Sequence, residues 1–193
     1  MELYGLIGYP LSHSFSPAYF QEKFEKEGIN ADYLNFPIKA ADELPAIIAE
    51  NPKLKGLNVT IPHKEAVLPF MDEIDETAKA IGAVNTIKIL DDGKLKGFNT
   101  DVFGFVQSIK PLLKSHHRKA LILGTGGSSK AVVHGLNELR IETTMVSRNQ
   151  KGNVEFTYGD LTSAIIQEHT IIINCTPLGM HPKIQEYPQI PYE

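Results

Sequence analysis

Residues 119–129 read KALILGTGGSS, and this stretch decides the fold. Residues 119–123 are mostly apolar and predict a strand, which runs directly into a glycine-rich turn. Apolar residues then recur at helical spacing through residue 139, and residues 143–147 predict the next strand. The order strand, glycine turn, helix, strand is typical of the start of a dinucleotide-binding fold.

The glycine turn is a candidate site for a pyrophosphate. A helix start offers backbone N–H groups and the positive end of the helix dipole, and glycines let a ligand approach closely. The usual third glycine is Ser129 here, a small residue that still permits close packing of helix and strand. The candidate cofactor residues are Gly124, Thr125, Gly126, Gly127, Ser128 and Ser129. The competing interpretation is a tight connection that binds nothing.

The end of the second strand indicates which dinucleotide binds. NAD-binding domains carry an acid there, about 20 residues after the turn, but this chain has Ser147, Arg148 and Asn149. A guanidinium and a hydroxyl suit a 2′-phosphate, so Ser147 and Arg148 favour NADP, although Arg148 could be a solvated loop residue. The polar loop after the strand at 170–173 adds Asn174, Thr176 and Leu178 as candidate cofactor residues; a plain loop is the alternative.

The rest of the chain alternates predicted strands with predicted helices. Strands are expected at 3–7, 33–37 and 56–61, a hairpin at 85–98, and helices between them, including one at 63–70. This alternation predicts the α/β class with mostly parallel sheets. We expect an N-terminal α/β substrate domain over residues 1–101. A connecting helix and linker over 102–117 and a Rossmann-type dinucleotide-binding domain over 118–193 complete the expected order.

Four polar clusters interrupt the apolar elements of the first half. They are Ser12–Pro17, Asn58–Lys64, Asn85–Thr86 and Asn99–Asp101. Hydroxyls beside a helix start can cradle a carboxylate, and a lysine beside aligned amide and hydroxyl groups can bind a substrate oxygen. The competing interpretation makes Ser16 and Asp101 ordinary helix N-caps and Lys64 a solvated lysine.

Composition excludes several classes of protein. The net charge of −4 provides no basic surface for nucleic acid, and no apolar run is long enough for a membrane span. The single cysteine, Cys175, cannot form an internal disulfide, and the seven histidines lack metal-ligand spacing. We therefore expect a soluble cytoplasmic protein, monomer or homodimer, with no metal, no nucleic-acid partner and no membrane partner.

Taken in order, these motifs resemble the shikimate dehydrogenases of aromatic amino-acid biosynthesis. The resemblance covers essentially the whole chain, including GAVNT at 82–86, GFNTD at 97–101 and NCTPLG at 174–179. It implies that Ser14 and Ser16 bind the substrate carboxylate, and that the ring hydroxyls are surrounded by Asn58, Thr60, Lys64, Asn85 and Asp101. It also implies NADP as cofactor, with Lys64 and Asp101 as the catalytic residues.

The implied reaction is the reversible NADPH-dependent reduction of 3-dehydroshikimate to shikimate. Alternatives are a quinate/shikimate dehydrogenase that uses NAD, a folate-linked methylene dehydrogenase, and a non-catalytic shikimate-binding fragment. The polar, proline-rich residues 182–193 look like a loop. We therefore expect a C-terminally truncated chain whose nucleotide sheet is incomplete and has an unpaired apolar edge, so that it binds NADP poorly and turns over little.

Overall fold

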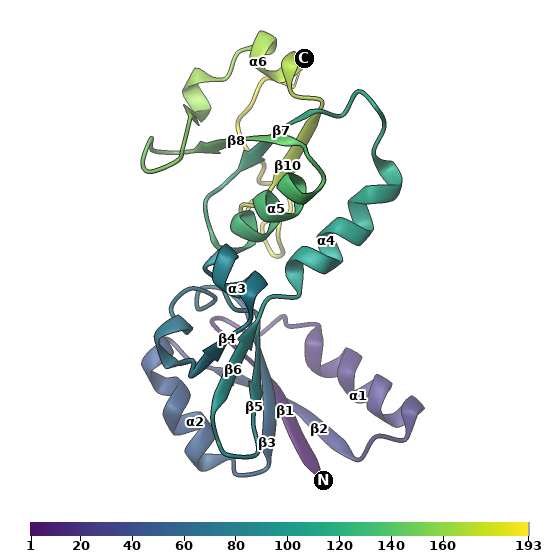
Figure 1. Ribbon diagram of the computed structural model, residues 1–193, viewed down its shortest axis with the longest axis vertical. Coiled ribbons are helices and arrows are strands. Elements are labelled where there is room, and N and C mark those ends of the chain that lie inside the picture. The colour runs from purple at the N-terminus through teal and green to yellow at the C-terminus, as the bar shows by residue number, and fades with distance from the viewer. Residues whose placement is uncertain (193) are drawn as a thin grey trace. The chain divides into compact units, whose positions relative to one another are not determined.

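The computed structural model describes residues 1–192 of the chain; Glu193 lies outside the described residues. The chain forms two compact units that divide between Thr100 and Asp101 (Figure 1). Each unit contains a sheet and helices that alternate with its strands along the sequence, which confirms the predicted α/β class. The two units are described separately below.

The first unit is built on a six-stranded sheet of order β2-β1-β3-β5-β6-β4. Its strands are β1 (Glu2–Gly8), β2 (Ala31–Pro37), β3 (Leu54–Val59), β4 (Glu73–Ile74), β5 (Thr86–Ile89) and β6 (Leu95–Phe98). The sheet is mixed: β2 and β3 run parallel to β1, whereas β5 is antiparallel to both β3 and β6. Gly93, at φ +84°, makes the predicted hairpin turn between β5 and β6.

Helices cover both faces of this sheet. They are α1 (Ser16–Glu27), α2 (Leu44–Glu50) and α3 (Glu76–Ile81). Neighbouring residues of β1 point to opposite faces, so Leu6 packs with Phe24 of α1 whereas Ile7 joins the cluster that contains Leu44 of α2. One face of the sheet therefore packs on α1 and the other on α2, and the carboxyl ends of β1 and β3 are held in place between them.

Two local predictions in this unit are wrong. Residues 64–67 form turns, and a short 3₁₀ helix follows at Leu68–Phe70, where an α-helix was predicted. Pro69 donates no backbone hydrogen bond, and the carbonyl of Lys64 is taken by the backbone N–H of Val84 at 2.8 Å. Ser16 is the first residue of α1 and not its cap, because Phe15 occupies the N-cap position.

The second unit contains a parallel sheet of order β10-β7-β8-β9. Its strands are β7 (Lys119–Leu123), β8 (Glu142–Ser147), β9 (Phe156–Thr157) and β10 (Ile171–Asn174). Its helices are α4 (Asp101–Ile109), α5 (Gly127–Glu138) and α6 (Ser163–Glu168). Residues of α4 and α5 pack on Ala120 and Ile122, and residues of α6 pack on Leu121 and Leu123. Both faces are thus covered, as in a doubly wound nucleotide domain.

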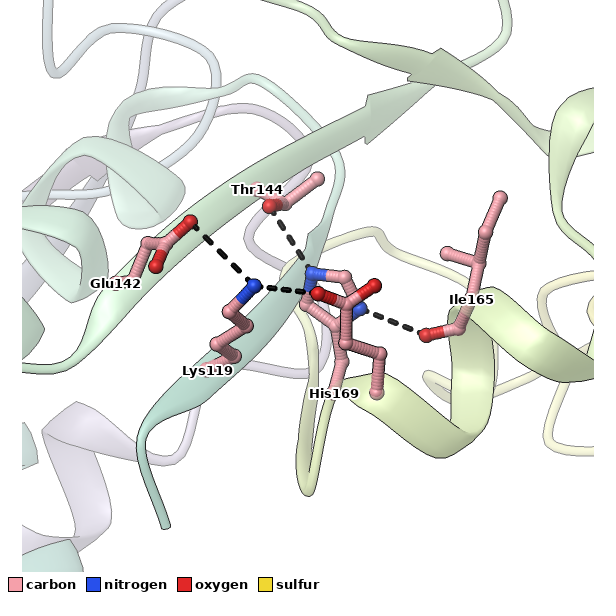
Figure 2. A network of polar contacts seen from close by, with 6 residues as sticks. Lys119, Glu142, Thr144, Ile165 and His169 are labelled. Carbon is pink, nitrogen blue, oxygen red and sulfur yellow. Dashed lines mark hydrogen bonds and ion pairs between the residues drawn. The ribbon is translucent and has the colours of Figure 1, made fainter.

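A buried histidine holds the segment just before β10 in place (Figure 2). His169 is 7% exposed, and its ring contacts the hydroxyl of Thr144 in β8 at 3.1 Å and the carbonyl of Ile165 in α6 at 2.7 Å. Beside it, Lys119 of β7 pairs with Glu168 and with Glu142. The Lys119 ammonium lowers the pKa of the Glu168 carboxyl. These contacts tie α6 to β7 and β8 just before β10 begins.

β10 is an edge strand of the described sheet, and residues 182–192 follow it without a helix or strand, as the sequence predicted for that loop. Among the described residues, no helix is long and apolar enough to cross a membrane. The same residues contain no cluster of three or more histidine, cysteine, aspartate or glutamate side chains able to hold a metal ion.

Candidate functional site

Two polar loops of the first unit follow neighbouring parallel strands. Ser14 and Ser16 follow β1, and Thr60 to Lys64 follow β3. The backbone N–H of Thr60 donates to the carbonyl of Ile7 at 2.9 Å, so the pairing of these strands continues to the start of the second loop. Because the carboxyl ends of parallel strands meet at one sheet edge, the candidate substrate residues of both loops lie at the same edge.

The serine loop shows how a carboxylate could be held. The hydroxyl of Ser14 accepts a hydrogen bond from the backbone N–H of Ser16 at 3.3 Å. Ser16 begins α1, and the N-cap residue, Phe15, makes no capping hydrogen bond with its side chain. Two hydroxyls therefore stand beside a helix N-terminus, whose positive end favours an anion.

Amide and hydroxyl groups form a hydrogen-bonded chain across the sheet. The amide nitrogen of Asn58 donates to the hydroxyl of Thr86 at 3.4 Å, and that hydroxyl donates to the amide oxygen of Asn85 at 3.0 Å. The Asn85 amide oxygen also accepts from the backbone N–H of Thr100 at 2.9 Å. Asn58 and Asn85, which lie 27 positions apart in the sequence, are thus joined through Thr86.

The backbone around Lys64 is fixed by its neighbours. His63 is 2% exposed, and its ring contacts the carbonyl of Ile38 at 2.8 Å. The carbonyl of Lys64 accepts from the N–H of Val84, one residue before Asn85. Lys64 is half-buried. The lysine side chain therefore extends from a turn whose backbone is hydrogen-bonded to the segment that carries Asn85.

Asp101 lies at the boundary of the two units. It is the first residue of α4, and its carboxylate is an acid in the first turn of that helix. The preceding residue, Thr100, is hydrogen-bonded to Asn85 through both its backbone N–H and its hydroxyl. The structure therefore fixes the chain immediately before Asp101 within the first unit.

The second unit presents the glycine turn at the carboxyl end of β7. Gly124 has φ +106°, and its N–H donates to the carbonyl of Val146 at 2.9 Å. Gly126 is the N-cap of α5, where no side chain makes a capping hydrogen bond. Ser129 is fully buried and donates to the carbonyl of Gly126 at 2.7 Å. The small residue in place of the third glycine is thus packed inside the unit.

The other cofactor candidates follow the two strands that flank β7. Ser147 is the last residue of β8 and is half-buried, whereas Arg148 is exposed. Burial raises the pKa of Tyr158, and the nearby Arg148 guanidinium opposes part of that rise. After β10, the oxygen of the Asn174 amide accepts from both the N–H and the hydroxyl of Thr176. The Asn174 amide nitrogen donates to the carbonyl of Leu178 at 3.1 Å. These bonds shape the loop next to the glycine turn.

Cys175 follows β10 directly and carries a half-buried thiol. Burial raises the pKa of Cys175 to about 11 from an ordinary value of 9.0. We predict that its reaction with a thiol-exchange reagent at mildly alkaline pH is about 10²-fold slower in the folded protein than in denaturant, because only the thiolate reacts. Absorbance of the thiolate that the reagent releases measures both rates, and equal rates would contradict the predicted protection.

Sequence comparison identifies the family. A family pattern described as the shikimate dehydrogenase substrate binding domain matches residues 6–87. A curated shikimate dehydrogenase (NADP(+)) from Methanosphaera stadtmanae is 37% identical over 204 residues, which cover 96% of this chain and 71% of the relative. The chain belongs to the shikimate dehydrogenase family. The predicted resemblance is therefore confirmed.

Solved shikimate dehydrogenases share the fold. The crystal structure of the enzyme from Aquifex aeolicus matches with a TM-score of 0.83 and 34% identity, covering 95% of this chain and 71% of that one. The enzyme from Thermus thermophilus, solved with NADP(H) and shikimate, matches with a TM-score of 0.79 and 29% identity over 99% of this chain and 74% of that one. These matches confirm the predicted order of a substrate domain followed by a Rossmann-type domain.

Sequence reasoning missed one polar residue beside the candidate site. Tyr33 was interpreted only as the start of a strand, yet its hydroxyl donates to the amide oxygen of Asn58 at 2.8 Å. The available signal was its residue type, because a buried tyrosine needs a partner for its hydroxyl.

Proposed function

We propose that this chain binds shikimate and 3-dehydroshikimate through its first unit and NADP through its second, and interconverts the two substrates. The observation that carries this proposal is the identity with NADP-dependent shikimate dehydrogenases over nearly the whole chain. In this proposal residues 1–101 form the substrate domain, residues 102–117 connect it, and residues 118–193 form the NADP-binding domain.

The glycine turn fits NADP, the cofactor for which the related enzymes are named. A Cβ atom added at Gly126 would meet no atom within 4 Å, so the space before the α5 N-terminus is open to a ligand. The pyrophosphate would lie against residues 124–129, and the 2′-phosphate against Ser147 and Arg148. Bound NADPH would supply the hydride. The prediction of NADP as the cofactor is confirmed by the relatives' names and by a related enzyme solved with NADP⁺.

The residues of the first unit have distinct proposed roles. Ser14 and Ser16 hold the carboxylate at the start of α1, and Asn58, Thr60 and Asn85 hydrogen-bond the ring hydroxyls. Reduction of a ketone develops negative charge on its oxygen, so a donor must stabilise that oxygen. We assign this role to Lys64, with Asp101 as the second catalytic residue.

The decisive experiment measures turnover and binding in the same preparation. NADPH absorbance should fall when 3-dehydroshikimate is added, and shikimate should bind in a separate calorimetric titration. Quinate with NAD serves as the competing pair. Shikimate binding without turnover would instead support the non-catalytic alternative, and turnover only with quinate and NAD would support the other dehydrogenase.

Arg148 should decide between the two cofactors. We predict that Arg148→Ala weakens NADP binding by about 1.5 kcal/mol, roughly tenfold, because only NADP has a 2′-phosphate to lose a charge-assisted contact. This loss of binding free energy lies at the low end for charge-assisted contacts, because the Arg148 guanidinium is exposed. NAD binding should be unchanged. Affinities for both cofactors, measured by calorimetry, test this; equal weakening of the two would indicate a general structural role.

We also propose that the protein acts in the cytoplasm as a monomer or homodimer. Its single cysteine, which cannot form an internal disulfide, is typical of proteins in reducing compartments. Light scattering coupled to size-exclusion chromatography distinguishes the two oligomeric states.

A further inference from the structure

Tyr33 is a rigidly held residue of β2. Its side chain is 4% exposed, and its ring stacks on Phe20 of α1 with centroids 4.5 Å apart and planes 11° from parallel. Phe24 and Leu6 belong to the same cluster. The ring is thus fixed by apolar packing, which determines where the hydroxyl lies.

The hydroxyl of Tyr33 holds one candidate substrate residue. It donates to the amide oxygen of Asn58 at 2.8 Å. Burial raises the pKa of Tyr33 to about 12, so the phenol stays protonated and able to donate at neutral pH.

This donation determines how Asn58 presents its amide. With the oxygen committed to Tyr33, the amide nitrogen faces the hydroxyl of Thr86 at 3.4 Å. That nitrogen carries two hydrogens, and Thr86 takes only one. The other is a donor suited to a ligand oxygen.

The hydrogen bonds form one directed chain. Tyr33 donates to Asn58, Asn58 donates to Thr86, and Thr86 donates to Asn85. In such a chain each bond orients the next group, so the chain behaves as a unit. It joins β2, β3 and β5, and it includes two of the residues assigned to substrate, Asn58 and Asn85.

We propose that Tyr33 is a positioning residue for the substrate, whose hydroxyl orients Asn58 for a ring hydroxyl of the ligand. This inference rests on the proposed function, which assigns Asn58 to a ring hydroxyl of shikimate. Tyr33 acts through Asn58 and is not itself assigned a contact with substrate.

The test removes only the hydroxyl. Tyr33→Phe keeps the ring and its stacking on Phe20, and Tyr4→Phe is the matched control, because the Tyr4 hydroxyl bonds Glu2 at an exposed position of β1. Shikimate affinity of the full chain is measured by calorimetry, and thermal unfolding of each variant is followed in parallel. We expect about tenfold weaker shikimate binding for Tyr33→Phe and no change for Tyr4→Phe.

A double-mutant cycle separates positioning from general structural damage. If Tyr33 acts through Asn58, adding Tyr33→Phe to Asn58→Ala should weaken binding less than Tyr33→Phe does alone. Losses that simply multiply, or equal shikimate affinities for Tyr33→Phe and the unmodified chain, would overturn the positioning role alone. Absence of shikimate binding by the unmodified chain would overturn the proposed function, and this role with it.

Discussion

Replacement of Lys64 by alanine is expected to lower kcat for 3-dehydroshikimate reduction by about 10²-fold or more while changing KM little. The ammonium group interacts most strongly with the oxygen once negative charge has developed on it, so its loss destabilises the transition state more than bound substrate. Steady-state rates of NADPH oxidation at varied 3-dehydroshikimate concentration give both constants.

The control for this experiment is Lys88→Ala. Lys88 is an exposed lysine of β5 in the same sheet and has no assigned role, so its removal changes the net charge equally. We expect kcat to stay within about twofold of the unmodified protein for this variant. An effect of Lys64→Ala confined to KM would contradict the catalytic assignment and make Lys64 a binding residue.

The strands and the glycine turn were predicted well because their signals are local. The apolar run at 119–123 became β7 with the same bounds, and the Asp-Asp-Gly sequence at 91–93 became the turn of the β5–β6 hairpin. In each case a few adjacent residues determine the backbone conformation.

The segment after β3 could not be predicted in the same way. A helix was expected at 63–70, but long-range hydrogen bonds hold this segment in turns: His63 contacts Ile38, and Lys64 accepts from Val84. Periodicity in a single sequence carries no information about such partners. Lys64 could be identified because the residues around it resemble a family motif, whereas its local conformation depended on residues 20 or more positions away.

The same reasoning explains why the role of Tyr33 was missed. Alternation along β2 predicts whether its side chain is buried, but not that its hydroxyl donates to Asn58, which is 25 positions away. The candidate substrate residues came from matching motifs in order. Groups that support those residues from other strands have no motif of their own, and only the fold reveals them.

Gly124→Ala should cause a large loss of stability in the second unit. Gly124 has φ +106°, a conformation that strains any residue with a Cβ. The added Cβ would also lie 3.1 Å from the methyl group of Thr176 and 3.2 Å from the carbonyl carbon and oxygen of Cys175. Strain and crowding together should lower the free energy of unfolding by about 2 to 5 kcal/mol. Urea unfolding measures this loss, and calorimetry should show weaker NADP binding as well.

Gly126→Ala, two residues away, should separate the ligand role of the turn from its structural role. Gly126 has φ −79° and ψ −178°, which alanine adopts readily, and its Cβ would meet no atom within 4 Å. We expect a stability loss of about 1 kcal/mol or less, but NADP affinity weakened about tenfold or more, because the methyl group would enter the space before the α5 N-terminus. Unchanged NADP affinity in this variant would mean that the glycines only make a tight connection. If the stability loss occurs only in Gly124→Ala while both variants lose NADP affinity, Gly124 maintains the fold of the turn and Gly126 keeps it open to the cofactor.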